Sequence, residues 1–211
     1  MATNHLPVRR KPVATMLKLE EFRGLKEELS EWRIQGQQDT GILGFVRGLR
    51  LSARLIYAIR HHLSFSGYEV DWGHLLTQEG DSCSPECDII IHKQGYVRQW
   101  NGNHNPVMNF KFISCQNAVA VISCKSSIAS IDKAYTKAMR PYVNKVFLFA
   151  ECCEPRAVKR LKKSALTAGY EGFWYLYACD KTMQCTVDEN EWIDFLDVLK
   201  RLVDAHLRRT L

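Results

Sequence analysis

The stretch Ser84-Pro-Glu-Cys-Asp-Ile-Ile-Ile91 decides how this chain folds, because it combines two acidic residues with a run of three isoleucines. An uninterrupted apolar run of this kind predicts a central strand that is covered on both faces of its sheet. Side chains two positions apart share one face of a strand, so we expect Glu86 and Asp88 to point the same way. The stretch therefore predicts a buried strand with an acid pair at its start.

A second stretch, Ala118-Val-Ala-Val-Ile-Ser-Cys-Lys125, has the same apolar character and ends in a lysine. Ser123 and Lys125 lie two positions apart and are expected to share a face of their strand. A lysine that closes a buried apolar strand needs a partner for its charge. If the two strands are neighbours, the acid pair and the lysine meet at one end of the sheet.

The rest of the chain changes between helical and extended periodicity, which is typical of a mixed α/β domain with a central sheet flanked by helices. We expect helices over residues 16–32, 41–63, 126–140, 155–168 and 191–207, and strands over 68–76, 86–91, 118–124, 145–150 and 173–179. Residues 93–116, rich in Asn and Gly, are too long for a simple turn and predict a hairpin or a long loop.

Length and composition agree with one domain. The chain has 211 residues, of which 46% are hydrophobic and 25% are charged, and its formal charge is +6. This composition excludes a disordered chain, and no run of about 18 apolar residues is present to cross a membrane. We expect a flexible tail over residues 1–15 and a single domain over residues 16–211 that buries a full core.

The eight cysteines are expected to be free thiols. The N-terminal sequence has no apolar stretch typical of a secretory signal, so we expect a cytoplasmic protein, and reducing compartments disfavour disulfides. Two pairs, Cys83 with Cys87 and Cys152 with Cys153, resemble halves of a zinc site. No second C-x₂-C motif completes them, so core thiols are the better interpretation.

Two carboxylates and a lysine at one end of a sheet suit the hydrolysis of phosphodiester bonds with a divalent metal. Mg²⁺ takes oxygen ligands from one or two carboxylates, keeps several waters and binds substrate phosphate. The lysine would orient or help deprotonate the attacking water and balance charge on the phosphate. Taken singly, Asp88 and Lys125 are explained as strand-end residues that bond to the backbone. Their joint occurrence favours the catalytic interpretation.

With Asp88 on the second strand and Ser123-Cys124-Lys125 on the third, the sequence resembles the PD-(D/E)XK nuclease superfamily, whose core has the order αβββαβ. The stretches around these residues look like a group of uncharacterised phage-linked or defence-linked nuclease domains that usually read S-x-Q-x-D and I-E-V-K. The resemblance covers about residues 43–150. It implies a restriction-endonuclease-like fold and a nuclease that uses Mg²⁺ or Mn²⁺ to cut DNA in restriction or phage defence.

The chain departs from that family at a ligand position. Ser123 stands where the Glu of the Glu-x-Lys motif is expected, and Glu86 stands where relatives tend to have Gln. Because Glu86 shares the face of Asp88, it is expected to restore the second metal ligand by migration. The resemblance thus implies Asp88 and Glu86 as metal ligands, Lys125 as the catalytic cation, and Ser123 as a group that orients a water or a phosphate.

Two functions therefore stay open at this stage. The Asp88 and Lys125 pair favours an active DNA nuclease, whereas Ser123 favours a catalytically degenerate member that serves as a DNA-binding or assembly subunit. A serine nucleophile is disfavoured because no nucleophile elbow surrounds Ser123. His92, on the face of Asp88, is a weak candidate for a substrate contact, and Glu69, Asp71 and Glu79 are weaker candidates for a further ligand.

Basic side chains supply the expected DNA contacts. Lys133, Lys137 and Arg140 are spaced i, i+4, i+7 on the helix expected after Lys125, and Arg54 lies on the first long helix. A solvated helix face explains the same spacing without a ligand. We expect DNA as the partner and no membrane, and the relatives that pair subunits to cut two strands imply a homodimer. The strandedness and sequence preference of the substrate are not fixed by these patterns.

Overall fold

The computed structural model describes residues 40–63, 67–95, 97–100, 110–180 and 185–209. The chain separates into two compact units, residues 1–43 and 44–211, and the second contains the sheet. The predicted tail over residues 1–15 and the predicted helix over residues 16–32 lie outside the described residues.

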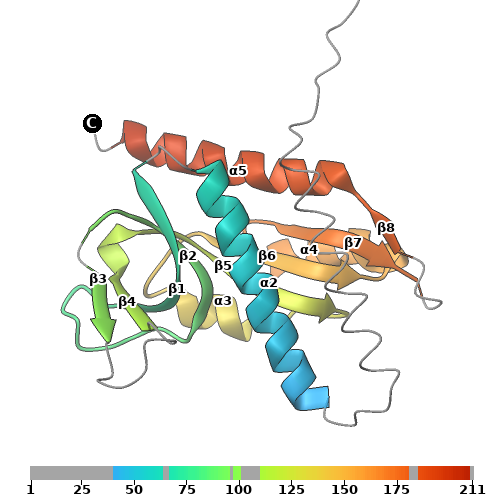
Figure 1. The fold of residues 1–211 in the computed structure, drawn as a ribbon, viewed down its shortest axis with the longest axis horizontal. Coiled ribbons are helices and arrows are strands. Elements are labelled where there is room, and N and C mark those ends of the chain that lie inside the picture. Colours follow the sequence, from blue (N-terminus) through green and yellow to red (C-terminus); the bar gives the residue numbers. More distant parts are fainter. Residues whose placement is uncertain (1–39, 64–66, 96, 101–109, 181–184, 210–211) are drawn as a thin grey trace, which may run out of the picture. The chain divides into compact units, whose positions relative to one another are not determined.

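A mixed sheet of eight strands forms the centre of the second unit, in the order β3-β4-β1-β2-β5-β6-β7-β8 (Figure 1). The strands are β1 (Tyr68–Leu76), β2 (Cys87–Lys93), β3 (Val97–Trp100), β4 (Phe110–Ser114), β5 (Ala118–Ile128), β6 (Val146–Cys153), β7 (Phe173–Cys179) and β8 (Cys185–Val187). The contacts β1/β4, β5/β6 and β6/β7 are parallel and the other four are antiparallel.

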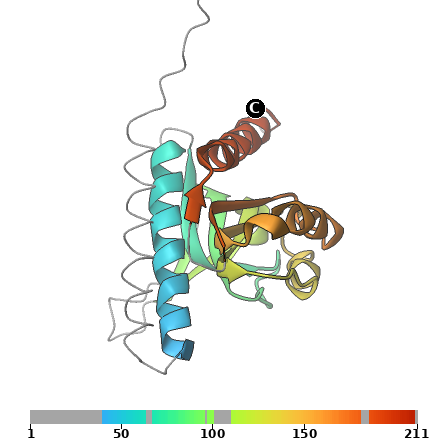
Figure 2. The same ribbon diagram turned by 90° about the vertical axis from the view of Figure 1, so that its right-hand side faces the viewer.

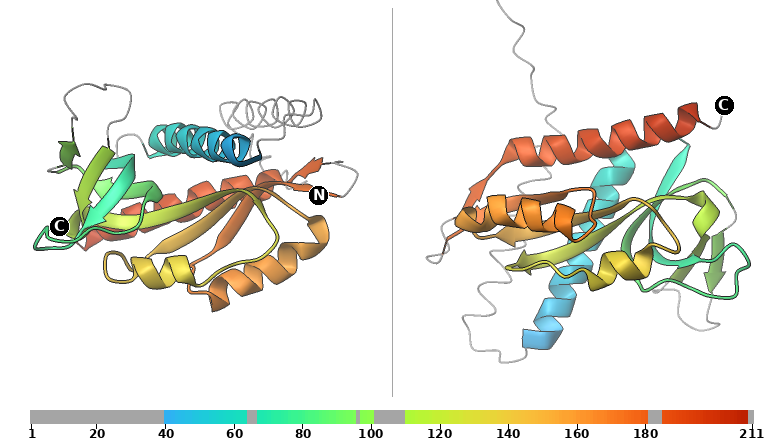
Figure 3. Two further views of the ribbon diagram at one scale, coloured as in Figure 1. Left: turned by 90° about the horizontal axis from the view of Figure 1, so that it is seen from below. Right: turned by 180° about the vertical axis from the view of Figure 1, so that it is seen from behind.

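The helices cover both faces of this sheet. They are α2 (Thr40–His62), α3 (Ala134–Met139), α4 (Val158–Thr167) and α5 (Glu189–Arg208), with short 3₁₀ turns at Cys115–Asn117 and Pro155–Ala157. Figures 2 and 3 show α3 and α4 on one face and α2 on the other. None of the helices in the described part of the chain is long and apolar enough to cross a membrane.

Apolar side chains explain this arrangement. The helix α2 buries Leu51, Leu55 and Ile59, which follow helical spacing along one stripe. Alternate residues of β6 serve opposite faces: Leu148 belongs to the core under α3 and α4, while Phe149 contacts Trp192 and Phe195 of α5. The predicted mixed sheet with an αβββαβ core is confirmed as α2, β1, β2, β5, α3 and β6, and the expected excursion is the β3/β4 hairpin.

The predicted helix over residues 126–140 is wrong over its first half. The strand β5 continues to Ile128, because Ser127 and Ile128 pair with Cys152 and Cys153 of β6. The helix α3 begins only at Ala134. A parallel neighbour that supplies backbone partners thus extends the strand beyond the point where the sequence pattern changes.

A buried carboxylate joins four elements of the fold. Asp71 in β1 has a side chain that is 3% exposed. Its Oδ1 accepts hydrogen bonds from Arg60 Nη2 of α2 at 2.5 Å and from Lys111 Nζ of β4 at 2.6 Å, and its Oδ2 lies 3.0 Å from His92 Nε2 of β2. Burial alone would raise the pKa of Asp71, but hydrogen bonds from His92 and Lys111 and the charges of Lys111 and Arg60 lower it to about 2.

We expect Asp71→Asn to lower the free energy of unfolding by about 2 kcal/mol, because Arg60 and Lys111 lose the buried carboxylate with which they pair. The pKa of Asp71 is lowered by folding, so its contribution is complete above the ordinary value of 3.8 and is lost as the pH falls through about 2. Urea denaturation over this range should show a loss of about 2 kcal/mol in the wild type that the variant lacks. Equal unfolding free energies for the two proteins would contradict this account.

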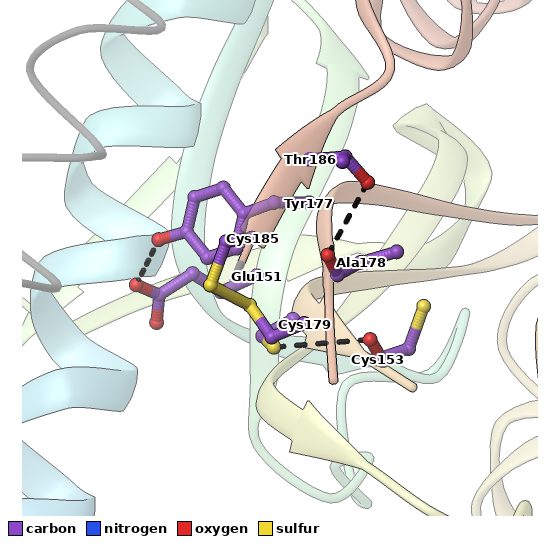
Figure 4. Close-up of a disulfide and its surroundings, with 8 residues drawn as sticks. Glu151, Cys153, Tyr177, Ala178, Cys179, Cys185 and Thr186 are labelled. Carbon is purple, nitrogen blue, oxygen red and sulfur yellow. Dashed lines mark hydrogen bonds between the residues drawn. A yellow bond between two sulfur atoms is a disulfide. The ribbon is translucent and has the colours of Figure 1, made fainter. Parts of the chain in front are cut away.

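Two of the eight cysteines form a disulfide, so the expectation of free thiols is wrong for this pair. Cys179 closes β7 and lies opposite Cys185 of β8 in an antiparallel register, with a Cα–Cα distance of 4.1 Å (Figure 4). The short strand β8 was not expected from the sequence, and the pairing that it creates brings the two thiols together. The cysteines 83, 87, 115, 124, 152 and 153 are not in disulfides.

Removal of this disulfide is expected to lower the free energy of unfolding by about 2 kcal/mol, since it closes only a short loop. Cys185→Ser should show this loss under oxidising conditions, and a reducing agent should impose it on the wild type. Cys83→Ser, which changes an exposed thiol outside the disulfide, is the matched control. The expectation fails if reduction leaves the wild-type unfolding free energy unchanged.

Candidate active site

The strands that carry the predicted acid pair and lysine are neighbours. Strand β2 pairs antiparallel with β5, and Ile89 lies opposite Ile122. At the adjoining positions the backbone N–H of Cys124 donates a hydrogen bond of 2.8 Å to Asp88 Oδ2. The expected meeting of Asp88 with the end of the β5 apolar run therefore occurs.

A pocket of about 500 Å³ opens at this end of the two strands. Its wall consists of residues from α2, β1, the start of β2, β5 and α3. The lining residues are Gly48, Leu49, Ser52, Ala53, Ile56, Trp72, Glu86, Asp88, Ser123, Lys125 and Tyr135. The four residues expected to act in catalysis thus share one pocket.

Asp88 is a carboxylate whose negative charge is only partly compensated. Its pKa is raised, chiefly because burial removes water from the charged form. The Cys124 N–H, the charge of Lys125 and a hydrogen bond from Ser123 act against this shift, while the charge of Glu86 adds to it. The residues that line the pocket carry two carboxylates and one ammonium, so a bound cation would balance their charge.

Glu86 lies just before β2 and is held at two points. Its Oε1 accepts a hydrogen bond of 2.6 Å from Trp72 Nε1, and its backbone carbonyl accepts one of 3.4 Å from Tyr135 Oη. Trp72 and Tyr135 were not identified from the sequence, because neither belongs to a motif and both act through residues distant in the chain. Only the register of β1 beside β2 brings Trp72 to Glu86.

Ser123 and Lys125 differ in exposure although they share a strand. Ser123 is 1% exposed and lies near Asp88, and its hydroxyl acts to lower the pKa of that carboxyl. Lys125 is exposed, and its ammonium makes no hydrogen bond or ion pair with any residue that the structure describes. This ammonium is available to a ligand in the pocket.

The expected DNA contacts lie on two walls beside the pocket. Arg54 follows the lining residue Ala53 on α2, and Lys133, Lys137 and Arg140 lie along α3 with exposed side chains. Lys133 is the N-cap of α3 and Arg140 its C-cap. None of these four lines the pocket as far as the described residues define it.

The cluster around Asp71 is a second place where a metal ion could bind, because possible ligand atoms of Glu69, Asp71 and His92 lie within 4.8 Å of one another. There, however, Arg60 and Lys111 already bond to the carboxylate that an ion would need. His92 is fully buried against Asp71, so the idea that it approaches a substrate beside Asp88 is wrong. The pair Glu86 and Asp88 therefore suits a metal ion better than the cluster around Asp71 does.

The eight-stranded mixed sheet, its flanking helices and its αβββαβ core define the restriction-endonuclease-like nuclease fold. Among solved structures the chain is similar to NucC of P. aeruginosa ATCC27853 in its cAAA-bound form, with 13% identity over 92% of each chain and a TM-score of 0.55. It is also similar to NucC of E. coli MS115-1, cAAA-bound, with 10% identity over 95% of this chain and 92% of that one and a TM-score of 0.54. The apo form of the E. coli protein is similar too, with 9% identity over 86% of this chain and 90% of that one and a TM-score of 0.51.

NucC is a PD-(D/E)XK-type nuclease of phage defence systems. At these identities the likeness is one of fold. No protein-family model matches the chain, and no curated protein matches it in sequence.

We expect Asp88→Asn to raise the free energy of unfolding by about 1 kcal/mol at neutral pH, because an amide still accepts the Cys124 N–H without a buried charge. Folding raises the pKa of Asp88, so the gain should shrink as the pH falls toward 3.8, where the wild-type carboxyl takes up its proton. Urea denaturation measures both effects. The same substitution at Asp71 should act in the opposite direction, and a loss of stability at both positions would contradict the assignment of excess negative charge to the pocket.

Proposed function

We propose that this chain is a metal-dependent nuclease that hydrolyses DNA phosphodiester bonds in restriction or phage defence. The observation that carries the proposal is the pocket in which Glu86, Asp88, Ser123 and Lys125 come together. Two acids with a lysine suit the chemistry of phosphodiester hydrolysis better than they suit a purely structural role. The fold shared with NucC, a nuclease of phage defence systems, supports the proposed setting.

The donors in the pocket fit Mg²⁺ or Mn²⁺. Asp88 and Glu86 offer hard oxygen ligands, and the raised pKa of Asp88 reflects a burial that its neighbours do not offset. These two carboxylates would hold the ion, which when bound supplies the Lewis-acid charge that polarises a phosphate and acidifies a water. The cysteine thiols nearby do not compete, since Cys87 and Cys124 are buried and burial raises the pKa of each thiol.

The remaining residues have roles that follow from their contacts. Lys125 places an exposed ammonium beside the acid pair, where it would orient the attacking water and balance the charge on the phosphate. The Cys124 N–H fixes the position of Asp88 by a hydrogen bond, and the buried Ser123 lies near this carboxylate. We propose that Ser123 supports Asp88 and that Glu86 serves as the second ligand.

Cations on α2 and α3 would hold the DNA backbone; those on α3 are exposed and Arg54 on α2 is partly buried. We propose phosphate contacts from Arg54 on α2 and from Lys133, Lys137 and Arg140 on α3. A duplex cut on both strands needs two such sites, so we propose a homodimer as the working assembly.

One observation favours a second function. Position 123 has a buried serine in place of a carboxylate, and loss of a ligand weakens metal binding. A chain that binds DNA without cutting it, as a DNA-binding or assembly subunit, is the alternative.

A plasmid-nicking assay tests the proposal. Supercoiled DNA should be nicked with Mg²⁺ or Mn²⁺ and should stay intact with EDTA. Asp88→Ala and Lys125→Ala should each lower the rate about 100-fold or more, because each removes a group that acts on the reacting phosphate or its ion.

Lys145→Ala is the matched control, since Lys145 is exposed, bonds to Glu171 and lies outside the pocket. Cleavage that survives both active-site changes would assign the activity elsewhere. A wild-type protein that shifts DNA in a gel but never nicks it would favour the second function.

A further inference from the structure

Trp72 contacts Glu86, the acid that we propose as the second metal ligand. Its side chain lines the pocket, and its Nε1–H donates a hydrogen bond of 2.6 Å to Glu86 Oε1. We propose that Trp72 is a positioning residue that holds Glu86 ready to bind the divalent ion; this inference rests on the proposed function.

The backbone fixes Trp72 from both sides. On one side, Asp71 is held by Arg60, Lys111 and His92. On the other, Gly73 has a φ of 151°, and a Cβ there would lie 2.0 Å from the carbonyl oxygen of Lys111. The position of the Trp72 backbone is therefore fixed by contacts that do not involve Glu86.

Strand alternation turns Trp72 toward the pocket. Neighbouring residues of a strand point to opposite faces of the sheet, so Asp71 serves the buried cluster while Trp72 reaches Glu86 in the pocket. Asp71 lies opposite Ile90 and Gly73 lies opposite Cys87, so two steps along β1 match three steps along β2. The extra residue of this irregularity therefore belongs to the start of β2, next to Glu86.

Glu86 needs such a support because it is exposed. A free glutamate side chain loses rotamer freedom when it binds an ion, at a cost of about 1.5–2 kcal/mol. The bond from Trp72 holds one oxygen before the ion arrives, and Oε2 has no hydrogen bond to any residue in the described part of the chain. The second oxygen thus remains for the ion.

The chemical type of the donor also matters. An indole N–H is a donor without charge, so it orients Glu86 and leaves its negative charge intact. The contrast with Asp71 is direct, because Arg60 and Lys111 neutralise that carboxylate. A neutral donor is the kind of support that a metal ligand tolerates.

The test measures Mn²⁺ affinity by electron paramagnetic resonance of the free ion, using the full chain. Trp72→Phe keeps the ring and removes the donor, and we expect it to weaken Mn²⁺ binding about 10-fold. In a Glu86→Ala background the same change should have no further effect. Trp174→Phe is the matched control, because Trp174 Nε1 also donates to a carboxylate, that of Asp194 at 2.9 Å, away from the pocket.

A second measurement does not depend on how Trp72→Phe folds. In the wild type, addition of Mg²⁺ should shift the ¹⁵N NMR signal of the Trp72 Nε1–H group, and the Trp174 signal should stay in place. In Glu86→Ala the Trp72 signal should no longer respond to the ion.

The outcomes separate the two proposals. If Glu86→Ala weakens Mn²⁺ binding while Trp72→Phe does not, or if Trp72→Phe weakens binding equally in both backgrounds, the positioning role is overturned and the nuclease proposal stands. An absent Mg²⁺ response of Trp72 in a wild type that binds Mn²⁺ overturns it as well. If the wild type binds no Mn²⁺, both proposals fail.

Discussion

The ion cluster around Asp71 is the contact on which the geometry of the pocket depends. One carboxylate receives groups from α2, β2 and β4, and Arg60 also donates to the carbonyl of Val70 at 2.7 Å. The helix that forms one wall of the pocket is therefore tied to the strand that carries Trp72. Because Asp71 and His92 are buried and the carboxylate has a partner for each of its oxygens, the cluster resists the small shifts that would misplace a ligand.

Two aspartates of one sheet have opposite electrostatic environments. Asp71 is surrounded by donors that lower its pKa, whereas Asp88 has one nearby ammonium and a nearby acid, and its pKa is raised. The first arrangement stabilises the fold, and the second leaves a demand for positive charge in a pocket. Such differences separate structural from functional carboxylates more sharply than residue type or position in a motif.

Extended periodicity predicted the strands over residues 68–76 and 173–179, which match β1 and β7, although only the second is apolar throughout. It failed where pairing decides the structure. Residues 126–128 join a strand because β6 continues beside them, and the disulfide of Cys185 depends on the pairing of β8. That Glu86, Asp88, Ser123 and Lys125 line one pocket could be anticipated, because each pair lies two positions apart in an extended segment. The contact between Trp72 and Glu86 could not, since it depends on the pairing of β1 with β2.

Gly73 shows which parts of this site are free to vary. Since a Cβ would meet the Lys111 carbonyl, no other residue fits there without moving β4, and movement of β4 would disturb Asp71 and Trp72 together. The acids of the pocket are under no such restriction, because a ligand can pass from one position to another on the same face. If the proposed function holds, the metal-binding carboxylates can therefore relocate during evolution, while Gly73, which takes no part in the chemistry, is the residue that cannot be exchanged.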